Sequence, residues 1–166
     1  MTQFKNLAFG ARWLVMGDIA EAAFRRRYPE AVRTGLDRAP TTKGLSLMER
    51  YEPDFRLGPK RTQRIEVMGI GRDQKLKLKV EKSFALCQWS AIEDVDLYVW
   101  DSYKKRDTSG PIDGWIDVLF KHGVYAYFPE GKAYIELHAR HFPYPWEAAC
   151  EEEDEAPTAT AGGAGG

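Results

Sequence analysis

The chain has 166 residues, which is typical of one compact domain and short for two. Hydrophobic residues make up 43% and charged residues 30%, which indicates a globular protein with a well-solvated surface and excludes a disordered chain. No apolar run approaches the roughly 20 residues of a membrane-spanning helix, and Arg12 breaks the run 7–16, so neither a membrane span nor a signal peptide is expected. With only Cys87 and Cys150, we expect no disulfide framework and take the cytoplasm as the default compartment.

The net charge of −1 conceals an uneven distribution. Six of the 25 acidic residues follow Trp146 and no Lys or Arg does, so residues 1–146 hold 19 acids against 24 bases, a formal charge of +5. A mildly basic body is compatible with a phosphate-bearing partner, although a solvated surface explains many such surpluses. The end of the chain is acidic, then rich in Gly and Ala, and has no apolar periodicity. We expect one domain over 1–146 and a disordered tail over 147–166.

The first periodic segment is helical. Asp18 and Glu21 have the spacing of a capping box, and the apolar residues that follow recur every three or four positions as far as Pro29. The pattern predicts a helix that begins at Asp18. A short first strand is expected near 31–35, and a loop over 37–44, which contains proline and glycine.

Strand patterns dominate the middle of the chain. Alternation begins at Leu47 and resumes at Ile65 after the breaker segment 58–61, which predicts two strands joined by a short hairpin. Apolar spacing over 76–92 then favours a second helix, but its first residues, 75–80, also alternate like a strand, and both readings stay open.

The remaining apolar patterns also predict strands. The run Leu97–Trp100 is typical of a buried strand. Segments 124–128 and 133–137, separated by the turn residues 129–132, predict a hairpin appended to the core. The order of elements favours an α/β domain with a mixed sheet.

The register of the first hairpin brings two acids together. If it closes around Lys60, residues whose numbers sum to about 120 face one another, which sets Phe55 opposite Ile65 and Asp54 opposite Glu66. Two carboxylates at that separation repel by about 3 kcal/mol at an effective dielectric of 20, so they call for a counter-charge. Mg²⁺ or Mn²⁺ suits such hard oxygen ligands and takes its remaining ligands from water or a phosphate.

At this point the sequence resembles the PD-(D/E)XK, or restriction-endonuclease-like, nuclease superfamily, whose core runs helix, three antiparallel strands, helix, strand. The resemblance covers residues 17–101 and rests on Glu21 in the first helix, Pro53–Asp54 in the second strand and Glu66 in the third. It implies that Asp54 and Glu66 ligate the metal, that Glu21 assists, and that a lysine completes the catalytic site.

The lysine is the point of departure from that pattern. The motif expects it two residues after Glu66, where Met68 stands. Lysines relocate to neighbouring elements in this superfamily, and four lie downstream between 75 and 82. Of these we favour Lys79, with Lys77 second if the stretch is a strand.

Other polar clusters have weaker interpretations. The basic runs 25–27 and 104–106 could contact phosphates, although surface turns are commonly basic. His138 and His141 have a spacing usable for metal but lack a convincing third ligand, so no zinc site is expected. The aromatic residues Tyr98 and Trp100 lie in an apolar run and are expected to pack the core rather than stack on bases.

The resemblance implies a Mg²⁺- or Mn²⁺-dependent deoxyribonuclease, an endonuclease or exonuclease, acting on double-stranded or branched DNA. Recombination, repair, replication, and a phage or mobile-element context all suit such an enzyme, and a homodimer is compatible with it. The alternative is a catalytically impaired domain of the same fold, in which Met68 records the loss of the lysine and the domain binds nucleic acid or protein. An unrelated interaction module is the third interpretation.

Overall fold

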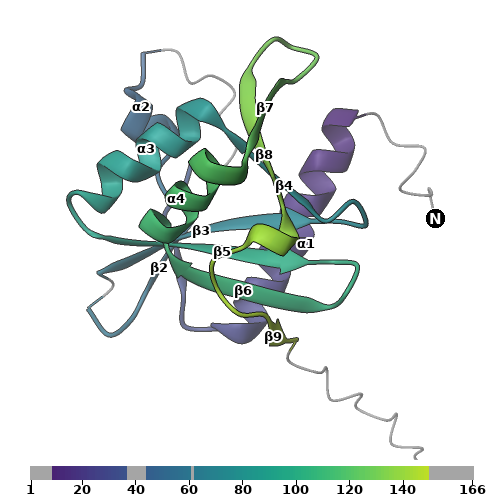
Figure 1. Cartoon of the computed structure of the whole chain (residues 1–166). Helices are drawn as coiled ribbons and strands as arrows, with labels where there is room; N and C mark the ends of the chain where they lie inside the picture. The colour runs from purple at the N-terminus through teal and green to yellow at the C-terminus, as the bar shows by residue number, and fades with distance from the viewer. Residues whose placement is uncertain (1–8, 37–43, 61, 150–166) are drawn as a thin grey trace, which may run out of the picture.

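The computed structural model describes residues 9–36, 44–60 and 62–149, which form a mixed α/β fold (Figure 1). The helices are α1 Phe9–Arg27, α2 Leu47–Arg50, α3 Val80–Ser90, α4 Ile112–His122 and the short 3-10 helix η2 Ala139–His141. The strands are β1 Val32–Arg33, β2 Phe55–Leu57, β3 Gln63–Ile70, β4 Lys75–Lys79, β5 Asp94–Asp101, β6 Arg106–Pro111, β7 Val124–Tyr127, β8 Ala133–His138 and β9 Glu147–Ala148.

The main sheet has the strand order β1-β2-β3-β5-β6-β9. The strand β2 is antiparallel to both of its neighbours, β1 and β3, whereas β5 returns parallel to β3 after α3. Helix, three antiparallel strands, helix and parallel strand therefore follow in the order that the sequence resemblance implied, and the predicted mixed α/β fold is confirmed.

The two faces of this sheet carry separate cores. On one face α1 packs on the odd-numbered residues of β3, such as Ile65, together with Tyr98 and Trp100 of β5, as expected for these two aromatic residues. On the other face α3 and α4 pack on Met68 and its neighbours, with Trp115 of α4 fully buried. Alternation along β3 therefore decides which helix each side chain meets. Within the described residues, no helix is both long and apolar enough to cross a bilayer.

The C-terminal hairpin of β7 and β8 is confirmed, and it belongs to a second sheet. Its strand β8 pairs with β4 from Lys75 opposite His138 to Lys79 opposite Tyr134, giving the order β4-β8-β7. The segment 75–92 thus combines both readings left open by its sequence, because β4 ends at Lys79 and α3 begins at Val80.

Several boundaries differ from the sequence predictions. The first helix begins at Phe9 rather than Asp18. The alternating segment at Leu47 is a helical turn, because Ser46 and Glu49 form a reciprocal capping box there. The elements β6, α4, η2 and β9 were not predicted. The first residues of the expected tail, Glu147–Ala148, pair with β6, whereas 150–166, like most of the expected loop 37–44, lie outside the described residues.

Candidate metal-binding carboxylate pair

Asp54 and Glu66 lie where the predicted hairpin register puts them. The strands β2 and β3 pair with Phe55 opposite Ile65, which continues to Asp54 beside Glu66. The Asp54 carboxylate accepts a hydrogen bond from the Val67 backbone N–H at 3.0 Å. Its backbone carbonyl accepts two more, at 2.9 and 3.2 Å, from the segment that follows β1. These bonds fix Asp54 at the end of the hairpin.

Glu66 occupies an unusual position for a carboxylate. It is fully buried, on the face of β3 that α3 covers. Oε1 forms a close ion pair with the Lys82 ammonium group, whereas Oε2 has no hydrogen-bond donor among the described residues. The Lys82 side chain is 23% exposed, so it covers Glu66 from the solvent side. A buried carboxylate with unfilled hydrogen-bonding capacity is costly unless another group satisfies it.

The charges of Asp54, Glu66 and Lys82 do not balance. Burial, and then the charge of Asp54, raise the pKa of Glu66 to about 8, although Lys82 acts in the opposite direction. Burial alone would lower the pKa of Lys82, but the charges of Glu66 and Asp54 raise it above its usual range. Two carboxylates therefore share one ammonium group, and one of them is left to bind a proton or a further cation.

The lysine beside Glu66 is Lys82. The two lysines favoured from the sequence, Lys79 and Lys77, have other neighbours. Lys77 lies in β4, with its ammonium 3.8 Å from Glu136 and 3.9 Å from Asp73. Lys79 ends β4 with its ammonium 5.8 Å from the centre of the Phe128 ring. Because the strand persists to Lys79, only Lys82 lies in the first turn of α3, which packs on the Glu66 face of the sheet.

Glu21 lies in α1, on the opposite side of the sheet from α3. Its carboxylate pairs with the guanidinium of Arg33 in β1 and lies 3.7 Å from that of Arg25. The core on that face contains Ile65 and Val67, whereas Glu66 points the other way. The structure thus unites Asp54 and Glu66 and leaves Glu21 in an ion-pair cluster of its own.

The donor set of the carboxylate pair fits a hard divalent cation. Within the described ranges, no group of three or more histidine, cysteine or acidic side chains could hold a metal ion. Mg²⁺ commonly binds through only one or two carboxylates and keeps several waters, so a pair is sufficient. The hydrogen-bonding capacity left over on Glu66 is what such an ion would use.

Neither the known protein-family models nor the curated protein sequences match this chain. Among solved structures, it is similar to Hjc, a Holliday junction resolvase from the archaeal hyperthermophile Archaeoglobus fulgidus. That similarity has a TM-score of 0.43 and 13% sequence identity, over 76% of this chain and 87% of the other. The mixed α/β architecture itself follows from the strand order and register described above.

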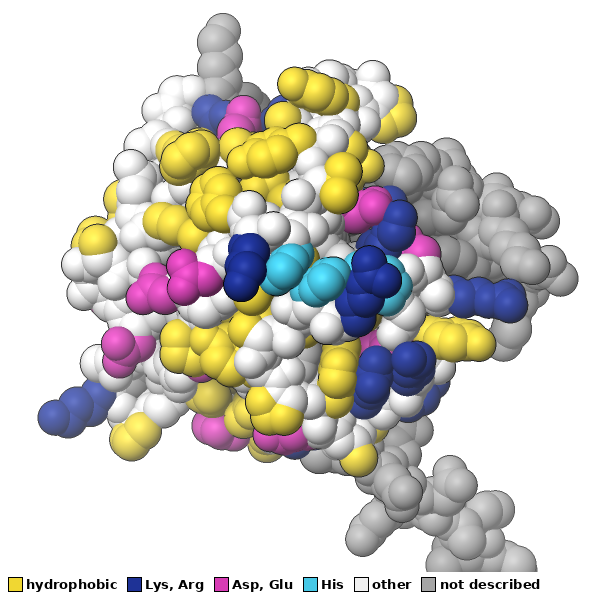
Figure 2. Space-filling view, in the orientation of Figure 1, with side chains coloured by type: hydrophobic (Ala, Val, Ile, Leu, Met, Phe, Trp, Pro, Cys, Tyr) yellow, Lys and Arg dark blue, Asp and Glu magenta, His cyan; other side chains and the backbone are white. Residues whose placement is uncertain are grey.

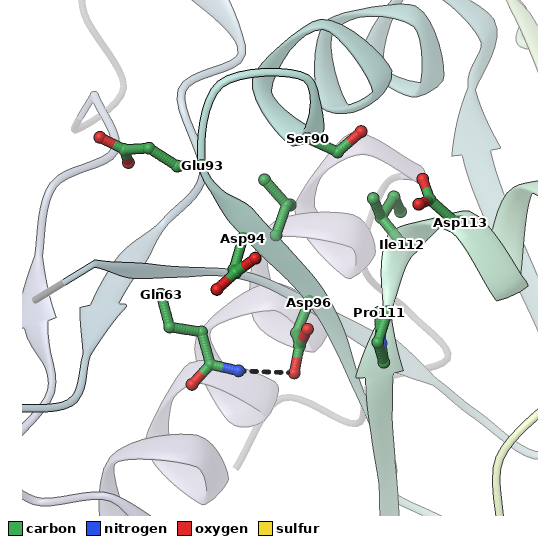
Figure 3. A pocket seen from close by; sticks show the side chains of 9 residues that line it. Gln63, Ser90, Glu93, Asp94, Asp96, Pro111, Ile112 and Asp113 are labelled. Atoms are coloured by element: carbon green, nitrogen blue, oxygen red, sulfur yellow. Dashed lines mark hydrogen bonds between the residues drawn. The ribbon is translucent and has the colours of Figure 1, made fainter.

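A second group of acids lines a cavity of about 310 Å³ where β3 and β5 begin (Figure 3). There Gln63 donates a hydrogen bond to Asp96 at 2.8 Å, and Asp94 and Asp113 lie on the same rim. Burial raises the pKa of Asp96, and the nearby charge of Asp94 adds to this effect. An acidic rim repels phosphates, so this cavity does not suit a nucleic-acid backbone.

Proposed function

We propose that this protein is a Mg²⁺- or Mn²⁺-dependent nuclease that hydrolyses phosphodiester bonds in DNA. The observation that carries the proposal is the buried Glu66 carboxylate, which has Asp54 beside it, Lys82 against it and hydrogen-bonding capacity to spare. A purely structural ion pair would match one acid with one base. Here two acids share one lysine, as expected where a second cation belongs.

Each of the three side chains has a distinct role in this proposal. Asp54 and Glu66 would hold the metal ion through their oxygens, with Asp54 oriented by the Val67 N–H. When bound, the ion would stabilise the charge of the phosphodiester transition state and lower the pKa of a water molecule. Lys82 would hold a phosphate oxygen or orient the attacking water with its ammonium group, which the two carboxylates keep protonated.

Lys82 thus takes the place of the lysine that the motif lacks at Met68. Lys82 follows Glu66 by sixteen residues along the chain, but it reaches the carboxylate because α3 packs on that face of the sheet. The proposal gives no role to Glu21, whose carboxylate pairs with Arg33, or to Lys77, which lies near Glu136. It gives none to Lys79 either, because that ammonium lies over an aromatic ring.

A second candidate is a binding module without catalysis. The specific observation in its favour is that Glu66 has no exposed surface and already has a cation, Lys82, against it. A metal would have to displace the ammonium from Glu66 or bind beside it. In that case the basic body of the protein would bind DNA and cleave nothing.

A cleavage assay separates the two candidates. Supercoiled plasmid and a four-way DNA junction are incubated with the full chain in Mg²⁺, in Mn²⁺ and in EDTA. We expect cleavage only with metal, falling to the EDTA level in Asp54→Asn and Glu66→Gln. Glu130→Gln, in the exposed turn between β7 and β8, is the matched control and should retain activity. Cleavage that survives in both site variants would refute the proposed site, and DNA binding without any cleavage would favour the second candidate.

A further inference from the structure

Three aromatic side chains on β7 and α4 are exposed to an unusual degree. Tyr125 is 60% exposed, Tyr127 74% and Phe120 58%. We call these three residues the aromatic patch. Figure 2 shows hydrophobic side chains gathered over α4 and the β7–β8 hairpin on this face of the molecule.

The strand pairing explains why the two tyrosines share a face. Tyr125 pairs with Ile135 and Tyr127 with Ala133, so both point to the side on which Ile135 packs against the core. Ile135 is buried there, whereas β7 is an edge strand of its sheet and its tyrosines remain exposed. Successive residues on one face of a strand are roughly 7 Å apart, so the rings form a short platform.

A row of basic side chains lies on the same face of the molecule as this platform (Figure 2). It contains all three histidines of the chain, together with Lys121 and Arg140. The rings of His122 and His141 are stacked with centres 4.3 Å apart. The guanidinium of Arg140 donates to His141 Nε2 at 3.0 Å, and its backbone N–H donates to His138 Nδ1 at 3.2 Å. We call these five residues the cationic row after the charges of Lys121 and Arg140; His138 and His141 accept their hydrogen bonds through an unprotonated ring nitrogen.

The permanent positive charges of the cationic row are those of Lys121 and Arg140. Arg140 donates to a histidine ring rather than to a carboxylate. The acid that precedes Arg140 along the chain, Glu136 of β8, is already paired with Lys75 at 2.6 Å. Burial, together with the neighbouring charges of His122 and Arg140, holds the pKa of His141 below its usual range, as expected where positive groups crowd together. The charges of Lys121 and Arg140, together with the N–H groups of the histidine rings, suit an anionic ligand.

We propose that the aromatic patch and the cationic row together bind an unpaired stretch of nucleic acid. Figure 2 shows the histidines in a continuous line flanked by Lys and Arg side chains, on the same face as the hydrophobic cluster. Bases stack on aromatic rings whatever their sequence, while cations hold the phosphates, and single-strand binding sites combine these two features. A protein partner would match the patch but would leave the row unexplained. The inference deepens the proposed function, because it adds unpaired nucleic acid to the substrate.

Binding is measured without cleavage, so that the two proposals are tested separately. Fluorescence anisotropy follows a labelled 20-nucleotide oligothymidine and a duplex of equal length, with the full chain carrying Glu66→Gln in EDTA. We expect the single strand to bind more tightly than the duplex. Tyr125→Ala combined with Tyr127→Ala should raise the Kd for the single strand at least about tenfold, as loss of base stacking predicts. Absence of cleavage in the other assay would not affect this result.

Three further variants make the test specific. Tyr125→Phe with Tyr127→Phe keeps the rings and should bind within about twofold of the parent, because stacking uses the ring face. Tyr103→Ala, which removes a tyrosine that is 57% exposed in the β5–β6 turn, is the matched control and should change nothing. Arg140→Ala should lower the salt dependence of binding by about one phosphate contact.

Two results would overturn the inference. One is single-strand affinity that is unchanged in the alanine double variant. The other is a parent protein that forms dimers by light scattering, together with an alanine variant that is monomeric but binds DNA equally well. In that case the aromatic patch would be the interface with a second copy of the chain.

Discussion

Lys82 contributes to stability as well as to the proposed chemistry, because it neutralises a carboxylate that has no exposed surface. We expect Lys82→Met to lower the free energy of unfolding by about 2–3 kcal/mol, somewhat below the usual cost of breaking a fully buried pair, since the lysine is partly exposed. Urea denaturation at pH 7 measures this loss.

A double variant that also changes Glu66 provides the control for that prediction. Combining Lys82→Met with Glu66→Gln removes both charges, so the double variant should lose less than the sum of the two single losses. Lys79→Met, which removes a lysine from the end of β4, is the matched single variant. Additive losses in the double variant would contradict a direct Lys82–Glu66 pair.

A second residue-scale prediction concerns Asp96. Because burial raises the pKa of Asp96, the native state holds the Asp96 proton more tightly than the unfolded chain does. The free energy of unfolding therefore falls as pH rises from the ordinary pKa of 3.8 through the raised pKa of the native state. At pH 7, Asp96→Asn removes this penalty while keeping an oxygen for Gln63. We expect a higher Tm than the parent's at pH 7, and a smaller difference near pH 3.5. A Tm that is lower at pH 7 would contradict the prediction.

At the scale of elements, Tyr144 packs against Gly110 of β6 and Gly114 of α4. Its hydroxyl donates to the carbonyl of Pro111 at 2.8 Å, and a Cβ added at Gly110 would lie 2.6 Å from its ring. We expect Gly110→Ala to cost about 1–3 kcal/mol, because the ring must move. Gly17→Ala in α1, where a Cβ meets nothing within 4 Å, should be neutral or stabilise by up to about 1 kcal/mol. Thermal unfolding of the two variants compares them directly.

The last strand, β9, pairs with β6, and an arginine at the end of α1 also holds it. Arg27 donates to Asp107 at 2.8 Å, to Glu147 at 2.9 Å and to the backbone carbonyl of Ala148 at 2.7 Å. We expect Arg27→Ala to detach β9, so that the amides of 147–149 exchange with deuterium much faster, as mass spectrometry would detect. Arg25→Ala, which removes a largely exposed arginine, should leave that exchange unchanged.

The sequence predicts local pairing better than it predicts which element each lysine joins. The register about Lys60 followed from one turn and two apolar patterns, and it placed Asp54 and Glu66 correctly beside each other. Lys82 was not singled out, because its position depends on the residue at which β4 becomes α3, and 75–80 fits either periodicity.

The unpredicted strand β6 has a different cause. Its sequence, Arg-Asp-Thr-Ser-Gly-Pro, shows no apolar alternation. It joins the sheet through pairing with β5, from Asp96 opposite Pro111 to Asp101 opposite Arg106. Its polar side chains find partners there: Asp107 accepts from Arg27, and Thr108 donates to the carbonyl of Tyr144. Contacts of this kind come from residues distant in the chain and leave no local signal.

For the whole molecule, the carboxylate pair predicts that metal stabilises the fold. Because Asp54 directly precedes β2 and Glu66 lies in β3, an ion that binds both favours the native state, by about 2.7 kcal/mol at 100 times its Kd. Differential scanning calorimetry should show a Tm that rises with Mg²⁺ or Mn²⁺ concentration in the parent and stays constant in Glu66→Gln. An equal rise in the variant would mean that the metal binds elsewhere.

The direct passage from β4 into α3 couples the two halves of the molecule mechanically. Lys79 ends the strand and Val80 begins the helix, so no flexible loop separates the three-stranded sheet from Lys82. The five register pairs with β8 prevent β4 from sliding alone. Pulling on the hairpin would therefore rotate the start of α3, and strain applied at one end of the protein would be transmitted through Lys82 to the buried Glu66.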